Sequence, residues 1–153
     1  KVQIIHITGT DGYEQFIHDL KSTGINVGNS GNIIIRPYLH SMEYAFACAD
    51  LCVARAGAAF LSEMTAKGIP GILVPYPFAA ENHQEYNAKS LVQKGAAVMI
   101  KDDRLSGEFL LQEVSKILFN EPQRKLMAEK SKEAGNCQAI EKIVEVIRPY
   151  LSK

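Results

Sequence analysis

Residues 51–59 read LCVARAGAA, an apolar run that leads at once into a loop of small residues and the start of a helix. The run predicts a buried strand over 51–54, and the stretch 58–67 predicts a helix that ends at Gly68. A strand that passes through a tight turn into a helix is the repeating unit of folds with a parallel sheet.

The same alternation continues on both sides of this stretch. Strands are predicted at 2–7, 32–35, 71–75 and 96–100, with helices over 13–20, 40–49 and 82–94. The strands are apolar throughout, as strands buried on both faces must be. We therefore expect an α/β fold in which a Rossmann-like parallel sheet carries helices on both faces. After the last strand the chain is expected to end in a helical segment, with helices over 106–119, 122–134 and 136–150.

The composition narrows the class of protein. The chain has 153 residues, 46% hydrophobic and 22% charged, which fits one globular domain. Seventeen Lys and Arg residues balance seventeen Asp and Glu residues, so the basic surface typical of a nucleic-acid-binding protein is not expected. No apolar run approaches the ~18 residues of a membrane span. The cysteines Cys48, Cys52 and Cys137 form no C-x-x-C pair and fit reduced thiols in the cytosol.

The loop after the strand at 51–54 is the first candidate for binding. Ligands of open parallel sheets bind beyond the carboxyl ends of the strands. Arg55 and Gly57 lie there, and backbone N–H groups at the following helix start could approach an anion. Tight packing of strand against helix would explain the small residues equally well. Glu63, about one and a half turns into the helix, is either a ribose ligand or an ordinary solvated side chain.

The loop after the strand at 71–75 is the second candidate. Two prolines stiffen it, and polar groups then open a helix at Asn82, His83, Gln84 and Asn87. Such groups could bind hydroxyls. Alternatively, Asn82 caps the helix and Glu85 completes a capping box, which leaves the other polar residues unexplained.

The remaining motifs point to packing. Residues 36–42, after the strand at 32–35, contain a proline and an aromatic ring that could wall a flat ligand, but packing against the sheet is the favoured interpretation. The other histidines, at positions 6, 18 and 40, lack the spacing of metal ligands. No metal site, cofactor or catalytic residue is predicted, since no nucleophile or phosphate-loop motif is found.

Several segments in order resemble one family: RPYLHSM (36–42), ADLCVARAGA (49–58), SE (62–63), GIPGILVPYP (68–77), NHQEYNA (82–88) and GAA (95–97). Together they are similar to the MurG-type N-acetylglucosaminyltransferases of peptidoglycan synthesis. The resemblance implies that residues 1–153 are the UDP-sugar donor-binding half of a two-domain glycosyltransferase B fold. Such an enzyme moves N-acetylglucosamine from UDP-N-acetylglucosamine to lipid I with inversion and without a metal.

The resemblance also implies roles for individual residues. The backbone of Leu39 would meet the uracil, Glu63 would hold the ribose hydroxyls, and His83 and Gln84 would address the hexose. The helix start that faces the diphosphate and sugar is formed by Ala58, Ala59 and Phe60. Arg55, Gly57 and Asn87 complete the expected substrate-binding set.

The resemblance further implies that part of the enzyme lies outside this chain. Residue 1 falls at what resembles the domain's second strand, so the first strand and its Gly-rich loop are expected elsewhere, as is the acceptor-binding N-terminal domain or partner chain. In the strand order 3-2-1-4-5-6, the absent strand separates the strands at 2–7 and 51–54, which therefore should not pair.

The expected partners are UDP-N-acetylglucosamine and a lipid-linked acceptor, not nucleic acid, for a cytoplasmic enzyme peripheral to the inner face of the plasma membrane. The chain alone would bind a donor without turnover. Alternatives are the donor subunit of a related split UDP-sugar transferase and a non-catalytic nucleotide-binding module.

Overall fold

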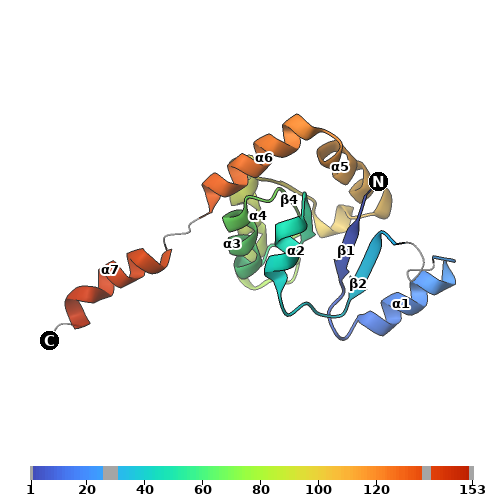
Figure 1. Ribbon diagram of the computed structural model, residues 1–153, viewed down its shortest axis with the longest axis horizontal. Helices are drawn as coiled ribbons and strands as arrows, with labels where there is room; N and C mark the ends of the chain where they lie inside the picture. Colours follow the sequence, from blue (N-terminus) through green and yellow to red (C-terminus); the bar gives the residue numbers. More distant parts are fainter. Residues whose placement is uncertain (1, 26–30, 136–138, 152–153) are drawn as a thin grey trace. The chain divides into compact units, whose positions relative to one another are not determined.

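The computed structural model describes residues 2–25, 31–135 and 139–151 (Figure 1). It divides into two compact units, residues 1–47 and residues 48–153. The described strands form two parallel sheets, a two-stranded sheet in the first unit and a three-stranded sheet in the second. No pairing between described strands joins the two sheets.

The first unit is built on the smaller sheet. Strand β1 (Ile4–Ile7) pairs with β2 (Ile33–Arg36). Helix α1 (Tyr13–Ser22) connects them, and its Phe16 ring stacks on the His6 ring of β1 at 4.6 Å. The prediction that every strand is buried on both faces is wrong here, because all of β1 is exposed and only Ile35 of β2 is buried. Two strands offer too little apolar surface to enclose both faces.

The second unit carries the larger sheet. Its strands β3 (Cys52–Ala54), β4 (Gly71–Leu73) and β5 (Ala97–Met99) lie in that order. Helices α3 (Ala58–Lys67) and α4 (His83–Gln93) connect its strands. Helix α2 (Met42–Cys48), which belongs to the first unit except for Cys48, comes before β3 in the chain. Strand β4 is buried along its whole length, as its apolar sequence predicts. As expected, β1 and β3 do not pair.

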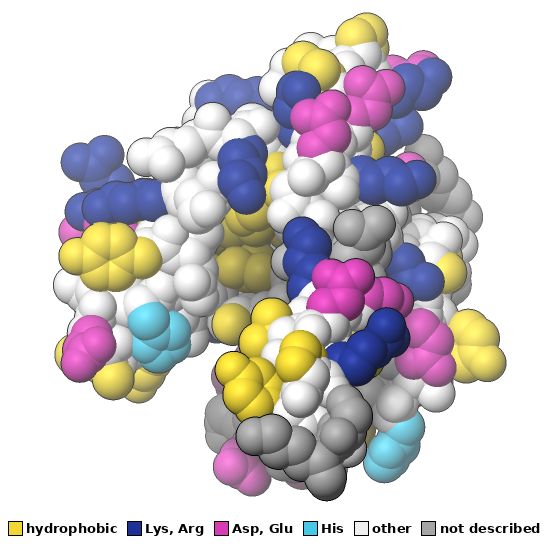
Figure 2. Space-filling model, turned by 90° about the vertical axis from the view of Figure 1, so that its left-hand side faces the viewer, with side chains coloured by type: hydrophobic (Ala, Val, Ile, Leu, Met, Phe, Trp, Pro, Cys, Tyr) yellow, Lys and Arg dark blue, Asp and Glu magenta, His cyan; other side chains and the backbone are white. Residues whose placement is uncertain are grey.

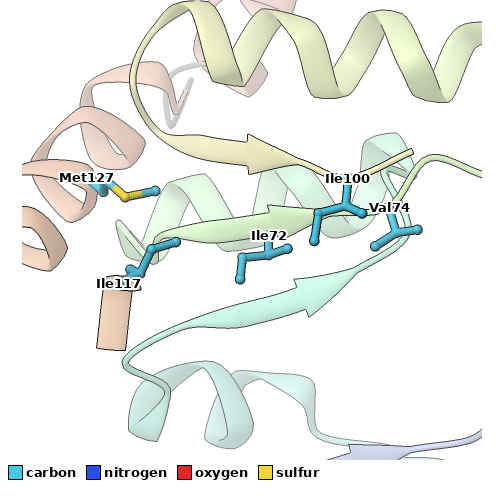
Figure 3. Packing of buried hydrophobic residues seen from close by; sticks show 5 residues of the cluster. All are labelled: Ile72, Val74, Ile100, Ile117 and Met127. Atoms are coloured by element: carbon cyan, nitrogen blue, oxygen red, sulfur yellow. The ribbon is translucent and has the colours of Figure 1, made fainter. Parts of the chain in front are cut away.

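The core of the second unit gathers around β4. Figure 3 shows Ile72 in the middle of the hydrophobic cluster. Val74 and Ile100 lie near one end of the cluster, and Ile117 and Met127 lie near the other end. These side chains are at most 5% exposed. Such burial removes enough apolar surface from water to hold the strand ends, and the loops that follow them, in place.

The chain ends in helices, as predicted. They are α5 (Gly107–Leu118), α6 (Glu121–Ala134) and α7 (Ala139–Leu151). The side chains of Ser106 and Asn120 cap α5 and α6. The expected start of the last helix at 136, with Cys137, lies outside the described residues. No helix in the described part of the chain is long and apolar enough to cross a bilayer.

Helix α7 is amphipathic and its apolar residues are exposed. In Figure 2, where this helix faces the viewer, hydrophobic side chains gather along one side of it and charged side chains along the other. The exposed apolar residues are Ile140, Ile143, Val144, Val146, Ile147, Tyr150 and Leu151. A helix with this pattern ordinarily covers its apolar side against another element.

Candidate functional site

Arg55 ties together the loops that follow the three strands of the larger sheet. Its Nη1 donates to the carbonyl oxygens of Val74, at 3.3 Å, and Pro75, at 3.2 Å, just after β4. The same nitrogen pairs with the carboxylate of Asp102, which lies after β5 in the short helix η2 (Asp102–Arg104). The guanidinium also lies over the Tyr76 ring, 5.6 Å from its centre. Arg55 was predicted to bind substrate, and the structure uses its Nη1 as a brace for the site.

The start of α4 holds the peptide groups of the loop after β3. The Gln84 Oε1 accepts the N–H of Ala56 at 3.1 Å and the N–H of Tyr76 at 3.0 Å. The Asn87 Nδ2 donates to the carbonyl oxygen of Ala56 at 3.1 Å. Both polar groups of the fully buried Ala56 therefore bond to side chains of α4.

Gly57 follows Ala56 and directly precedes helix α3. Gly57 is its N-cap, with φ −71° and ψ 138°, and offers no side chain to cap the helix. A Cβ built on Gly57 would meet no atom within 4 Å, so the space beside it is open. Ala58 and Ala59 are exposed. Since the first N–H groups of any α-helix lack intrahelical partners, this start is a partly positive surface suited to an anion.

Glu63 lies further along the same helix, where it is exposed. It forms no ion pair with another described residue. Its carboxylate is therefore accessible to a ligand, although an ordinary solvated Glu would also be exposed. Phe60, between the helix start and Glu63, is half-buried.

The loop before α4 has a shape that the sequence did not reveal. Glu81 and Asn82 both adopt left-handed backbone, with φ of 52° and 54°, around the short helix η1 (Ala80–Asn82). The Asn82 side chain does not cap α4, so the capping-box alternative is wrong. Glu85 instead pairs with Lys89 at 2.8 Å, and this bond holds the pKa of its carboxyl below the usual value.

His83 and a neighbouring hollow complete this edge of the sheet. The Nδ1 of His83 lies 2.8 Å from the carbonyl oxygen of Ala80, which can only accept, so Nδ1 carries the proton. A shallow hollow of about 240 Å³ is lined by Pro75, Tyr76, Pro77, Asn82, Glu85, Lys101, Asp102 and Asp103. Asp102 and Tyr76 could not be predicted from the sequence, because no motif marks the partners of an arginine from another loop.

Comparison with known proteins identifies the family. The sequence model of one protein family, the glycosyltransferase family 28 C-terminal domain, matches residues 1–143. This chain belongs to that family. A solved member, MurG of Acinetobacter baumannii, matches with a TM-score of 0.79 and 28% identity over 96% of this chain and 41% of its own. The glycosyltransferase VinC, solved with dTDP, matches at a TM-score of 0.69 but 16% identity, which shows the fold alone.

The sequences of curated relatives support this family assignment. One from Desulforamulus reducens is 46% identical over 153 residues, which are 100% of this chain and 41% of that relative. Another from Bacillus subtilis is 40% identical over 145 residues, 95% of this chain and 39% of the relative. Both are named UDP-N-acetylglucosamine--N-acetylmuramyl-(pentapeptide) pyrophosphoryl-undecaprenol N-acetylglucosamine transferase. The chain thus spans well under half the length of the relatives it matches.

For this family 28 domain, the structure brings together most of the residues predicted from the sequence. Those in the second unit lie in the loop after β3, on α3 or on α4: Arg55, Gly57, Ala58, Ala59, Phe60, Glu63, His83, Gln84 and Asn87. Leu39 belongs to the first unit, where it is half-buried between β2 and α2. No group of three or more His, Cys, Asp or Glu side chains suited to a metal occurs among the described residues.

Proposed function

We propose that this chain is the donor-binding part of an inverting glycosyltransferase that moves N-acetylglucosamine from UDP-N-acetylglucosamine to the lipid I intermediate of peptidoglycan. Membership of family 28 supports the proposal, as do the names of relatives up to 46% identical. The proposal includes an acceptor-binding N-terminal domain or partner chain, and a lipid-linked acceptor at the inner face of the plasma membrane. It also includes a first strand and Gly-rich loop outside residues 1–153.

The backbone conformation of Gly57 and the open space beside it are the main structural support for this proposal. The φ of Gly57, −71°, is open to any residue, and a Cβ there would meet no atom within 4 Å, so neither backbone nor packing requires glycine. Ser, Asp or Asn at this N-cap would stabilise α3 better, but their side chains would accept the N–H groups of the first turn. Glycine leaves these groups for a ligand and lets it approach closely. A diphosphate has the charge and the oxygens that fit.

The proposed donor complex assigns a task to each group. The start of α3, at Ala58 and Ala59, would bind the diphosphate and stabilise the charge that grows on UDP as the acceptor hydroxyl attacks the anomeric carbon. Glu63 would accept hydrogen bonds from the two ribose hydroxyls. The backbone of Leu39 would bind the uracil. Phe60 would lie beside the diphosphate and sugar, and His83 beside the hexose.

Calorimetry on the full-length protein tests this function. We expect UDP to bind, and UDP-N-acetylglucosamine to be preferred over UDP-glucose. Gly57→Asp should preserve or raise the unfolding midpoint, because Asp is a better N-cap, yet abolish UDP binding through its charge. Gly107→Asp is the control, since Gly107 is the first residue of α5, directly after its N-cap Ser106, and a Cβ there would meet no atom within 4 Å.

Three results would contradict the proposal in different ways. Equal UDP affinity in wild type and Gly57→Asp would remove the diphosphate from the start of α3. Preference for another sugar would indicate a related sugar-nucleotide transferase. Failure of the folded wild-type protein to bind any of the three ligands would indicate a module without donor-binding function.

A further inference from the structure

Two aromatic side chains are exposed in the loop that follows β4, at the edge of the sheet that carries the candidate site. Phe78 is 82% exposed and Tyr76 is 46% exposed. Their rings meet edge to face, with centres 5.6 Å apart. Aromatic rings contribute strongly to binding when another molecule covers them. Most of the Phe78 ring is therefore available to a ligand.

The loop holds this aromatic pair in a fixed place. A proline stands on each side of Tyr76 and restricts the backbone. The N–H of Tyr76 donates to the Gln84 Oε1 at 3.0 Å, and the carbonyl of Tyr76 accepts the N–H of Ala79 at 3.2 Å. The Arg55 guanidinium lies over the Tyr76 ring. Because the pair is ordered before a ligand arrives, covering it costs little conformational entropy.

The aromatic pair adjoins the groups that the proposed function places beside the donor hexose. The loop leads through η1 into His83 at the start of α4, and Tyr76 is bonded to Gln84. That bond uses only the Gln84 Oε1, so the Nε2 can still donate to a hydroxyl of the hexose. The acceptor hydroxyl must come within about 3 to 3.5 Å of the anomeric carbon of this hexose. The acceptor sugar consequently has to lie beside the hexose, close to this loop.

We propose that Phe78, supported by Tyr76, stacks on the pyranose ring of the N-acetylmuramoyl acceptor and so helps to select the acceptor. The inference rests on the proposed function, which supplies the donor hexose and the lipid-linked acceptor. The C–H groups on one face of a pyranose ring are apolar and slightly positive, and they pack on the negative face of an aromatic ring. An aliphatic side chain at position 78 would offer no such face.

The surroundings of the pair favour a sugar over a lipid chain or another protein. The hollow of about 240 Å³ beside Tyr76 has polar side chains on its walls, which suit hydroxyls and disfavour an undecaprenyl chain: Asn82, Glu85, Lys101, Asp102 and Asp103. Two rings of at most about 250 Å² each also offer less than the roughly 800 Å² that each partner contributes to a stable protein interface. A sugar ring, apolar on its face and polar around its edge, matches both features.

Steady-state kinetics of the full-length protein test this role, with UDP-N-acetylglucosamine as donor and, as acceptor, a lipid I analogue in which a short isoprenoid replaces undecaprenol. Phe78→Ala should raise the KM for the analogue by on the order of tenfold. The kcat should change little, because the contact is made equally in the ground state and the transition state. The Kd of UDP-N-acetylglucosamine, measured by calorimetry, should also stay near the wild-type value.

Two further variants show whether the ring itself is needed. Phe78→Tyr keeps the ring and should behave like the wild type. Phe78→Leu keeps an apolar side chain without a flat face, and its KM for the analogue should approach that of Phe78→Ala.

Phe119→Ala is the matched control. Phe119 is 70% exposed and follows α5, two residues after Ile117, which lies at the opposite end of the hydrophobic cluster from Val74 (Figure 3). Removing this ring should change neither the KM for the analogue nor the Kd of the donor.

The outcomes separate this inference from the proposed function. An unchanged KM for the analogue in Phe78→Ala, or a wild-type KM in Phe78→Leu, would overturn the stacking role while the proposed function stands. An equal loss of donor affinity would also overturn it, because the ring would then not act on the acceptor alone. A wild-type protein that transfers no N-acetylglucosamine to lipid I would overturn the proposed function and this role with it. A rise in the acceptor KM alone, absent in Phe78→Tyr, supports the inference.

Discussion

Replacing Glu63 by Gln should weaken UDP binding by roughly ten- to a hundredfold and leave the fold intact. The side chain is exposed on α3 and forms no ion pair with another described residue, so neutralising it leaves no buried partner unsatisfied. A carboxylate that accepts a hydroxyl contributes ~1.5 to 3 kcal/mol to binding, and each 1.4 kcal/mol corresponds to about a tenfold change in Kd. The whole effect should therefore appear in binding.

A double-mutant cycle with 2′-deoxy-UDP locates the contact. In the wild-type protein, removing the 2′-hydroxyl should weaken binding, whereas in Glu63→Gln the same removal should have little further effect. Glu108→Gln makes the same charge change at an exposed position of α5 and serves as the control. An unchanged Kd in the folded variant, or an equal penalty for the deoxy ligand in both proteins, would refute the ribose assignment.

Two further predictions concern stability. Arg55→Met should lower the free energy of unfolding in urea by about 1 to 2 kcal/mol, because it leaves the carbonyls of Val74 and Pro75 without their donor. Asp102→Asn removes only a half-exposed ion pair and should lower the free energy of unfolding by less than about 1 kcal/mol. Equal losses of unfolding free energy in the two variants would contradict the role of Arg55 in bracing the loop after β4. Burial raises the pKa of the Cys52 thiol from 9.0 to about 11, so the unfolded chain loses this proton first. Stability should consequently fall as pH rises from 9.0 to about 11, and Cys52→Ala should show a smaller decline over that range.

Local signals made the elements of this chain predictable. Helix α3 begins and ends where the sequence indicated, because small residues follow the strand and Gly68 supplies the left-handed C-cap, with φ +69°. The unbroken apolar run of β4 correctly predicted a strand buried along its length. Pro122 lies in the first turn of α6, where its missing N–H costs nothing.

Predictions that needed neighbours in space were less successful. The apolar sequence of β1 suggested burial on both faces, but burial depends on how many strands and helices surround it. Glu81 and Asn82 adopt left-handed backbone although neither is glycine, and composition cannot signal this. The polar groups of α4 were correctly taken as a cluster, yet their bonds to Ala56 and Tyr76 were not foreseen.

The sequence by itself determined the alternation of strands and helices, the apolar centre of the sheet and the loops that carry the candidate site, because these follow from the spacing of residues near one another in the chain. Only the tertiary structure decided what the side chains in those loops do. The Gln84 Oε1 can accept equally well from a sugar hydroxyl or from a peptide N–H, and the choice depends on the backbone groups within reach. Ala56 lies 28 positions from Gln84, and the packing of α4 beside the ends of β3 and β4 makes them partners.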